Sequence, residues 1–326
     1  MDEILRIEDL RVAYHERDRA VRAVNGVSLS LHRGETLAIV GESGCGKTTA
    51  ALSILNLISE PGRIESGRVI FEGRDLLTLP GPELRGVRGR RISMIFQDPV
   101  SGLNPVMPIG TQVAEIVRAH LDVSAREAKQ AALDALSRQG LAEAERVAAS
   151  LPYQLSGGMC QRVMIAIATL LRPSIIIADE PTSALDVTVQ AAVLRELDEL
   201  KSTLGASIIL ITHDLGIVAQ MADRVAVMYA GRIVERGATA DIFARPRHPY
   251  TAALLAARPR IDAPDRPLEQ IAGAPPDLSQ LSAECAFVPR CRKALSVCRN
   301  EPSPALREIE PAHDAACYNP MYQPGD

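Results

Sequence analysis

Three short runs of the chain are almost continuously apolar. They are ETLAIV (35–40), SIIIAD (174–179) and ASIILIT (206–212). Runs of this length without polar alternation are typical of strands buried on both faces of a parallel sheet. We therefore expect three buried parallel strands, far apart in the sequence.

Other segments alternate between apolar and polar positions. Residues 4–40 show a strand-like alternation, with turns expected at Asn25–Gly26 and at residues 32–34. The stretch RVAVMYAGRIVERG (224–237) predicts a hairpin about Ala230–Gly231.

Helical periodicity appears between these strands. We expect helices over 47–58 and 187–203, and an amphipathic helix over 124–141 that begins at a serine cap. Strands and helices that alternate in this way predict an α/β fold with a mainly parallel sheet. Residues 99–150 are rich in alanine, glutamate, arginine and glutamine, and we expect a mostly helical insertion over about 98–165.

The pattern divides the chain into three parts. Residues 1–257 form one large domain, and a proline-rich linker without periodicity spans 258–282. Residues 283–326 form a small module with four cysteines and little helix or strand signal, which needs something besides an apolar core to order it.

Composition excludes several classes of protein. The net charge of −4, the 3% of aromatic residues and the absence of tryptophan disfavour a nucleic-acid binder. The first residues carry acids in place of a basic signal region, and no apolar run approaches the ~20 residues of a membrane span. We expect a soluble, cytosolic protein that can still dock on a membrane protein, with its cysteines unbridged.

Residues 41–49, GESGCGKTT, carry one of only four lysines in the chain. They fit the phosphate-binding pattern G-x-x-x-x-G-K-[ST] and lie between a predicted strand and a predicted helix. The alternative interpretation is an ordinary glycine-rich turn with an exposed lysine. In the phosphate-binding interpretation, backbone N–H groups and the helix start face a triphosphate, Lys47 reaches its β- and γ-phosphates, and Thr48 faces Mg²⁺. The predicted nucleotide-binding residues are Gly41, Glu42, Ser43, Gly44, Cys45, Gly46, Lys47, Thr48 and Thr49.

Two acids end the second buried strand. Asp179 can hold Mg²⁺, and Glu180 can polarise the water that attacks the γ-phosphate. The alternative is that both acids only cap the following segment. The pair following four apolar residues, in a chain with a phosphate loop, favours the catalytic interpretation.

Four more segments make the chain resemble the ATPases of ABC transporters. LSGGMCQR (155–162) resembles the signature of that family, IFQDP (95–99) its glutamine loop, SALD (183–186) its D-loop and ITHD (211–214) its switch histidine. The resemblance covers about residues 4–257 in family order. It implies a P-loop NTPase core with an antiparallel β subdomain and a helical subdomain.

The resemblance also implies roles for single residues. Gln97 would contact Mg²⁺ and the attacking water, His213 the γ-phosphate, and Asp186 the dimer interface. Tyr14 would lie against adenine, although it is nearly as well explained as a strand aromatic packing in the sheet. The signature residues Ser156, Gly157 and Gly158 would bind the γ-phosphate held by a partner subunit, so that two ATP molecules lie between two ATPase domains.

The end of the chain indicates which branch of this family the sequence resembles. RHPYTAALL (247–255) is similar to the segment after the ATPase core in oligopeptide and dipeptide importers, a branch that includes nickel and glutathione importers. Four cysteines follow with the spacing C-x5-C-x6-C-x18-C, which suggests a metal centre whose metal the spacing alone does not choose. The resemblance implies a [4Fe–4S] cluster; Zn²⁺ and four metal-free thiols are the alternatives. The four residues are Cys285, Cys291, Cys298 and Cys317. His313, near the last of them, is expected at the surface.

The sequence therefore predicts the ATP-hydrolysing subunit of a bacterial peptide importer. The resemblance implies a similar but distinct ATPase partner, two permease subunits and an extracytoplasmic binding protein, at the cytoplasmic face of the inner membrane. A nickel or glutathione importer remains an alternative. A soluble ABC ATPase of translation or DNA repair is disfavoured, because the chain has neither paired cores nor a long coiled-coil insertion.

Overall fold

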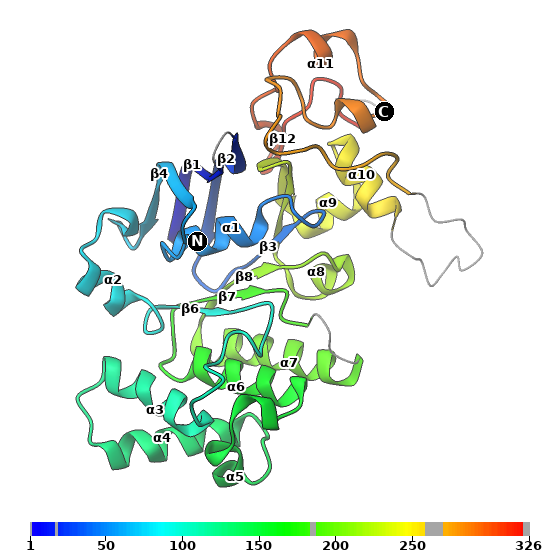
Figure 1. Ribbon diagram of the computed structural model, residues 1–326. Coiled ribbons are helices and arrows are strands. Elements are labelled where there is room, and N and C mark those ends of the chain that lie inside the picture. The colour runs from blue at the N-terminus through cyan, green and yellow to red at the C-terminus, as the bar shows by residue number, and fades with distance from the viewer. Residues whose placement is uncertain (1, 17–18, 183–186, 258–269, 322–326) are drawn as a thin grey trace. The chain divides into compact units, whose positions relative to one another are not determined.

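The computed structural model describes residues 2–16, 19–182, 187–257 and 270–321 (Figure 1). The chain divides into two compact units. The first unit joins Met1–Leu77 to Leu210–Asp326, and the second holds Thr78–Ile209. Asp186 and residues 258–269 of the predicted linker lie outside the described residues.

An antiparallel sheet fills the first part of the first unit. Its strands lie in the order β2-β1-β4-β5. Their bounds are β1 Glu3–Glu16, β2 Arg19–His32, β4 Gly62–Phe71 and β5 Arg74–Asp75. Apolar side chains at alternate positions, such as Leu10, Val12 and Val27, are fully buried. One face of this sheet therefore packs into the core.

The turn predicted at Asn25–Gly26 is wrong, because β2 continues through both residues. Gly26 has a φ of +81°, which absorbs a local irregularity in the strand. Asn25 donates from its backbone N–H to the carbonyl oxygen of Gly231 over 2.8 Å, and its Oδ1 accepts from Arg11. These partners satisfy the polar groups that a turn would otherwise have used.

A second set of strands in the first unit lies in the order β11-β12-β10-β9-β3. The bounds are β3 Thr36–Val40, β9 Arg224–Tyr229, β10 Arg232–Ala238, β11 Arg307–Glu310 and β12 His313–Ala315. β3 and β9 are parallel, and β9 and β10 form the hairpin that the sequence predicts about Ala230–Gly231. β12 pairs antiparallel with β10, so the end of the chain adds strands to the core sheet.

Within the described residues of the first unit, five helices accompany these strands. They are α1 Lys47–Ile54, α8 Leu215–Met221, α9 Thr239–Ala244, α10 Pro249–Ala256 and α11 Ser296–Asn300. α1 ends four residues before the predicted Ile58, because Asn56 adopts a left-handed φ of +50°.

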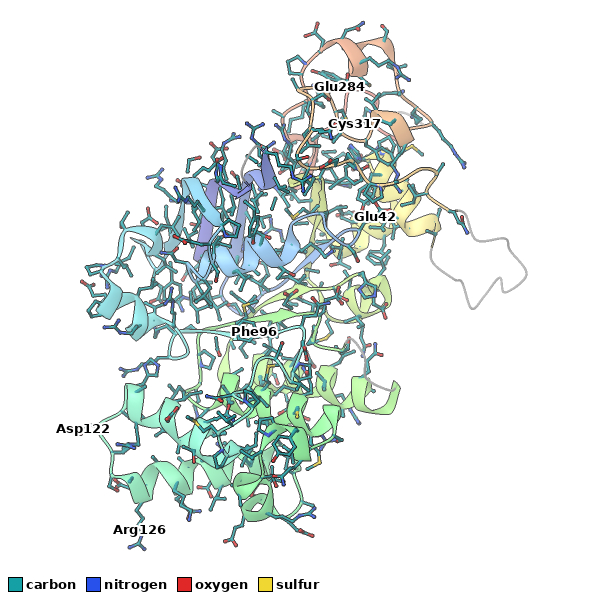
Figure 2. All side chains as sticks on the ribbon, viewed as in Figure 1. Glu42, Phe96, Asp122, Arg126, Glu284 and Cys317 are labelled. Atoms are coloured by element: carbon teal, nitrogen blue, oxygen red, sulfur yellow. The ribbon has the colours of Figure 1, made fainter. Side chains whose placement is uncertain are left out.

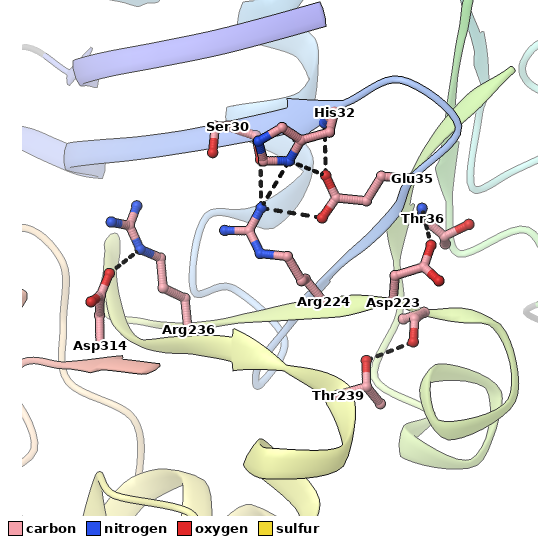
Figure 3. A network of polar contacts seen from close by, with 10 residues as sticks. Ser30, His32, Glu35, Thr36, Asp223, Arg224, Arg236, Thr239 and Asp314 are labelled. Carbon is pink, nitrogen blue, oxygen red and sulfur yellow. Dashed lines mark hydrogen bonds and ion pairs between the residues drawn. The ribbon is translucent and has the colours of Figure 1, made fainter. Parts of the chain in front are cut away.

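A polar network fastens the start of β3 to β9 (Figure 3). The buried carboxylate of Glu35 accepts from Arg224 Nη1 over 3.1 Å and from the His32 backbone N–H over 2.7 Å. Asp223 accepts from the backbone N–H of Thr36 over 2.7 Å. The strand that leads into residues 41–49 is thus fixed at its first residue.

The second unit is mainly helical. Its parallel strands are β6 Ile92–Ile95 and β7 Ile175–Asp179. Its helices are α2 Gly81–Val87, α3 Ile109–His120, α4 Ala125–Arg138, α5 Ala144–Ala149, α6 Gly157–Thr169 and α7 Val187–Leu204. β8 (Ser207–Ile211) leads the chain back to the first unit, and single 3₁₀ turns occur at Leu76–Thr78, Pro152–Gln154 and Val288–Arg290.

The serine cap predicted for residues 124–141 is confirmed. Ser124 Oγ accepts from the Glu127 backbone N–H, and the Glu127 carboxylate accepts from the Ser124 backbone N–H over 2.8 Å. This reciprocal pair satisfies two donors at the start of α4. In the described part of the chain, no helix combines the length and hydropathy needed to span a membrane.

Candidate functional site

The loop of residues 41–49 requires glycine at both glycine positions of its G-x-x-x-x-G-K-[ST] pattern. A Cβ on Gly41 would lie 2.1 Å from the Met228 carbonyl oxygen, and one on Gly46 would lie 2.0 Å from that of Ala23. Gly46 also has a φ of +103°. No L-residue side chain fits either contact, so the loop packs directly on the β9 and β2 backbones. We call residues 41–49 the phosphate loop.

Lys47 lies across this loop. Its buried ammonium donates to the carbonyl oxygens of Gly41 over 2.8 Å and of Glu42 over 3.0 Å. These neutral carbonyls hold the side chain over the loop without neutralising its charge. The positive charge is therefore available to an anion, and an exposed lysine on an ordinary turn is excluded for Lys47.

The start of α1 adds further groups for an anion. Lys47 is the first residue of the helix, so the N–H groups of its first turn follow the loop directly. The Thr48 side chain is exposed there, whereas Cys45 is buried. Burial raises the pKa of the Cys45 thiol, although nearby Lys47 opposes this, so Cys45 is not a reactive thiolate.

Two predicted contacts of the nucleotide lie elsewhere in the first unit. His213 is exposed in the short segment between β8 and α8. Tyr14 is half-buried in β1, and its Cε1 atom lies so near Gly62 that a Cβ there would be 2.7 Å away. The Tyr14 ring thus packs on the β4 backbone and retains a partly open edge.

In the second unit, β7 ends at Asp179, and Glu180 follows it directly. Both side chains are buried. Glu180 has a left-handed φ of +49°, a conformation that is costly for a residue with a Cβ and that recurs at functional sites. Backbone strain is therefore stored at the residue that directly follows β7.

The predicted signature segment also lies in the second unit. Ser156 caps α6 by accepting from the Met159 backbone N–H, and Gly157 begins the helix. A Cβ on Gly157 would meet nothing within 4 Å, so the fold of this chain does not itself require glycine there. Ser156 and Gly157 are exposed and Gly158 is half-buried, which leaves this helix start open to another molecule.

Gln97 follows β6 and is exposed, as is Phe96 before it (Figure 2). The next residues form a tightly bonded loop, because the Gln112 side chain accepts from the Asn104 N–H and donates to the Asn104 and Met107 carbonyls. Val106 on this loop is 82% exposed. A rigid loop thus presents an apolar side chain to solvent.

The cysteines of the tail, here residues 283–321, line one small cavity. Its volume is about 20 Å³, and Cys285, Cys291, Cys298 and Cys317 all contribute to its wall. Two sulfurs accept backbone N–H groups, Cys298 from Leu295 over 3.5 Å and Cys317 from Asn319 over 3.3 Å. Sulfur-only donors with N–H contacts fit a soft metal centre.

The side chains around that cavity are not arranged as a metal site. Within the described residues, no group of three or more His, Cys, Asp or Glu side chains is placed to hold a metal ion. All six cysteines are unbridged. Burial raises the pKa of Cys317 to about 12, so this thiol is protonated at neutral pH unless a cation compensates its charge. The predicted [4Fe–4S] cluster is not confirmed.

Glu235 anchors the tail to the core sheet. Its fully buried carboxylate accepts from the backbone N–H groups of Arg247 (2.6 Å) and His248 (2.7 Å) and lies 2.7 Å from His313 Nε2. The prediction of a surface His313 is wrong, since this residue is 1% exposed. The buried carboxylate needs donors, and the tail histidine supplies one of them.

A larger cavity of about 550 Å³ lies in the second unit, between α3, α4 and α5. None of the predicted nucleotide, catalytic or cysteine residues lines it. Its size alone therefore does not make it the nucleotide site.

Sequence reasoning missed three residues that contact the predicted sites. Tyr250 Oη accepts from the Glu42 backbone N–H over 2.8 Å, and Arg290 of the tail binds the Glu42 carboxylate. Gln161 donates to the Pro181 carbonyl. Gln161 lies in the motif LSGGMCQR and Tyr250 lies in the motif RHPYTAALL. Their positions in these motifs could have indicated that both residues contact the predicted sites. Nothing in the pattern pointed to Arg290.

Two family models match the chain. Residues 24–183 match the ABC transporter model, and residues 234–298 match the C-terminal region of oligopeptide/dipeptide transporters. The second match covers the RHPYTAALL segment and three of the four tail cysteines.

Relatives match over nearly their whole length. The chain is 46% identical over 320 residues to the oligopeptide transport ATP-binding protein OppD of Escherichia coli strain K12, covering 98% of this chain and 94% of that one. It is 44% identical over 320 residues to the dipeptide transport ATP-binding protein DppD of Bacillus subtilis strain 168, covering 98% and 95%.

A solved structure has the same fold. It is a dimeric post-hydrolysis state of the ATP-binding cassette MJ0796 bound to ADP and Pi, with a TM-score of 0.66 and 28% identity. The match covers 72% of this chain and 99% of that one. The predicted α/β ATPase fold is therefore confirmed.

Proposed function

The chain belongs to the ABC-transporter family, as an ATPase subunit of the oligopeptide and dipeptide import branch that powers peptide uptake. On this basis we propose a role for each of its predicted site residues. The observation that carries the proposal is the phosphate loop, with both glycines sterically required and Lys47 held across it. Gly41 to Thr49 wrap the phosphates, and Lys47 binds the β- and γ-phosphates.

Oxygen donors would hold Mg²⁺ beside the phosphates. The Thr48 hydroxyl, the Asp179 carboxylate and the Gln97 amide are ligands of the type that Mg²⁺ prefers. Mg²⁺ when bound would neutralise phosphate charge. Glu180 orients and polarises the attacking water, and His213 donates to the γ-phosphate. Tyr14 stacks against adenine.

A second subunit completes each nucleotide site. Ser156, Gly157 and Gly158 present an exposed helix start whose glycine this fold does not itself need, which suits close approach to a γ-phosphate held by another molecule. Asp186 would act across the same interface. We propose that the partner is a homologous but distinct ATPase, which makes the assembly a heterodimer.

The assembly docks on two permease subunits at the cytoplasmic face of the bacterial inner membrane, served by an extracytoplasmic binding protein. Loop 98–108 is the coupling surface, because Gln112 fixes it and Val106 is 82% exposed on it. ATP binding closes the two ATPases and hydrolysis reopens them, which drives the permease between its two orientations.

We propose that the four tail cysteines would hold a [4Fe–4S] cluster, which would supply the order that a small core lacks. Their shared cavity and the two N–H···S contacts support this assignment. Anaerobic purification followed by absorbance, iron and sulfide assays tests it. Iron and sulfide in about equal amounts are expected, whereas a colourless, zinc-loaded protein would contradict it.

The function as a whole is tested in the reconstituted complex. Peptide uptake into vesicles should require ATP and should stop when Lys47→Met is introduced into the full chain. Uptake that continues without ATP would contradict the proposal. Binding measurements on the extracytoplasmic receptor then distinguish dipeptides and oligopeptides from nickel and glutathione.

A further inference from the structure

The tail reaches the phosphate loop through one ion pair. Arg290 donates to both carboxylate oxygens of Glu42, from Nη1 over 2.6 Å and from Nη2 over 2.9 Å. Glu42 is the second residue of the phosphate loop, and Arg290 lies 248 positions later, next to Cys291. A paired, two-pronged contact of this kind fixes both position and direction.

The guanidinium is held on its remaining sides as well. Its Nε donates to the Ala272 carbonyl over 2.9 Å, and Nη1 also contacts the Tyr229 hydroxyl at 3.3 Å. The Arg290 side chain is 4% exposed and that of Glu42 is 24% exposed. Arg290 is therefore a fixed element rather than a surface side chain that happens to meet an acid.

Aromatic packing holds the two segments together around this pair. Tyr229 of β9, Tyr250 of α10 and Phe287 of the tail have ring centroids between 4.5 and 5.4 Å apart. Tyr250 Oη accepts the backbone N–H of Glu42. The loop residue is thus held at its backbone by the core and at its carboxylate by the tail.

The charges explain why this contact matters for nucleotide. A carboxylate in the loop that wraps a triphosphate repels it, and the repulsion is strong where burial limits screening by water. We propose that Arg290 is a positioning residue for ATP: by neutralising and orienting Glu42 it lets an acidic side chain stand in the phosphate loop, and it makes ATP affinity depend on a docked tail. This inference rests on the phosphate loop being the nucleotide site, as proposed above.

The test is calorimetric titration of ATP and Mg²⁺ into the full-length chain. Arg290→Met should raise the Kd for ATP on the order of tenfold at low ionic strength, and by less at high ionic strength. Adding Glu42→Gln to Arg290→Met should restore the Kd to within about twofold, since the uncompensated charge is gone. Arg290→Lys keeps the charge but loses the two-pronged contact, so its Kd should lie between those of the unmodified chain and of Arg290→Met.

Controls separate the possible outcomes. Arg292→Met removes the same charge from an exposed site in the same segment and should leave the Kd unchanged. If the double variant binds as weakly as Arg290→Met, the residue only fastens the tail and the inference fails. An unchanged Kd in Arg290→Met also overturns it.

Two further measurements keep the test decisive. If Arg290→Met does not fold, Glu42→Gln alone decides, because it leaves the Arg290 charge uncompensated beside the loop: a tighter Kd supports the charge argument, and an equal or weaker Kd refutes it. Lys47→Met reports on the proposed function separately: an unmodified chain that binds no ATP, or a Lys47→Met variant that binds it normally, would remove the nucleotide site itself.

Discussion

Gln161 on α6 donates from its Nε2 atom to the carbonyl oxygen of Pro181 over 2.9 Å, within the buried interior of the second unit. Ser156 caps the same helix, and Pro181 directly follows Glu180. The helix that would face a partner's nucleotide is therefore bonded to the segment that carries the proposed catalytic acid.

Replacing Gln161 with leucine should slow hydrolysis without weakening ATP binding. The change leaves the Pro181 carbonyl without this donor, which costs about 1–3 kcal/mol of folding free energy, and it loosens the segment that orients Glu180. We expect a several-fold lower kcat in the assembled complex and an unchanged Kd for ATP. Gln130→Leu on the exposed face of α4 is the matched control; equal losses in both variants would contradict the connection.

Glu180→Gln should bind ATP but fail to release it. The amide cannot polarise the attacking water as a carboxylate does, so we expect hydrolysis to fall about 100-fold or more. ATP should then hold the two ATPase subunits together, as size-exclusion chromatography of the mixed subunits would show. The exposed Glu145→Gln serves as control, and ordinary turnover in Glu180→Gln with its partners present would refute the role of Glu180.

Val106→Asp should abolish peptide uptake and leave the Kd for ATP unchanged. A buried, unpaired carboxylate at a permease interface is costly, whereas the same side chain in the free subunit is solvated. Uptake into vesicles and calorimetry on the free subunit measure the two effects. Leu121→Asp, at the end of α3, carries the same change outside loop 98–108 and should transport normally.

Glu196→Gln on α7 should stabilise the chain at neutral pH by about 0.5 kcal/mol, a modest value because the carboxyl is still partly solvated. Burial raises the pKa of Glu196 above its value in the unfolded chain. Its ionised form therefore opposes folding, and this cost appears as the pH rises through the raised pKa. Denaturant unfolding should show the gain at pH 7 and none below about pH 4, where both side chains are neutral. A gain of equal size at both pH values would exclude the ionisation as its cause.

Local chemistry predicted much of the fold. The apolar runs that became β3, β7 and β8 needed no more than their length and lack of alternation. Ser124 and Glu127 carry the capping pair in adjacent turns, so the start of α4 is encoded within four residues. The phosphate loop is similarly self-contained.

The predictions that were wrong concern residues whose conformation or burial is determined by partners far away in the sequence. Asn25–Gly26 has the composition of a turn, but Gly231 and Arg11 satisfy Asn25 within a continuous strand. His313 is polar, yet it lies in the interior, where it contacts the buried carboxylate of Glu235. The Arg290–Glu42 pair joins residues 248 positions apart, and no periodicity or motif spans such a separation.

The pairing of β12 with β10 has a consequence for anyone who trims this protein. Cutting the chain after the ATPase core would uncover the edge of β10, where Glu235 and Arg236 lie opposite Ala315 and Asp314 and where the Val234 carbonyl accepts from the Ala316 N–H. A bare strand of this kind recruits strands from other molecules. Shortened versions would consequently be prone to self-association and poor solubility even with every nucleotide-binding residue in place.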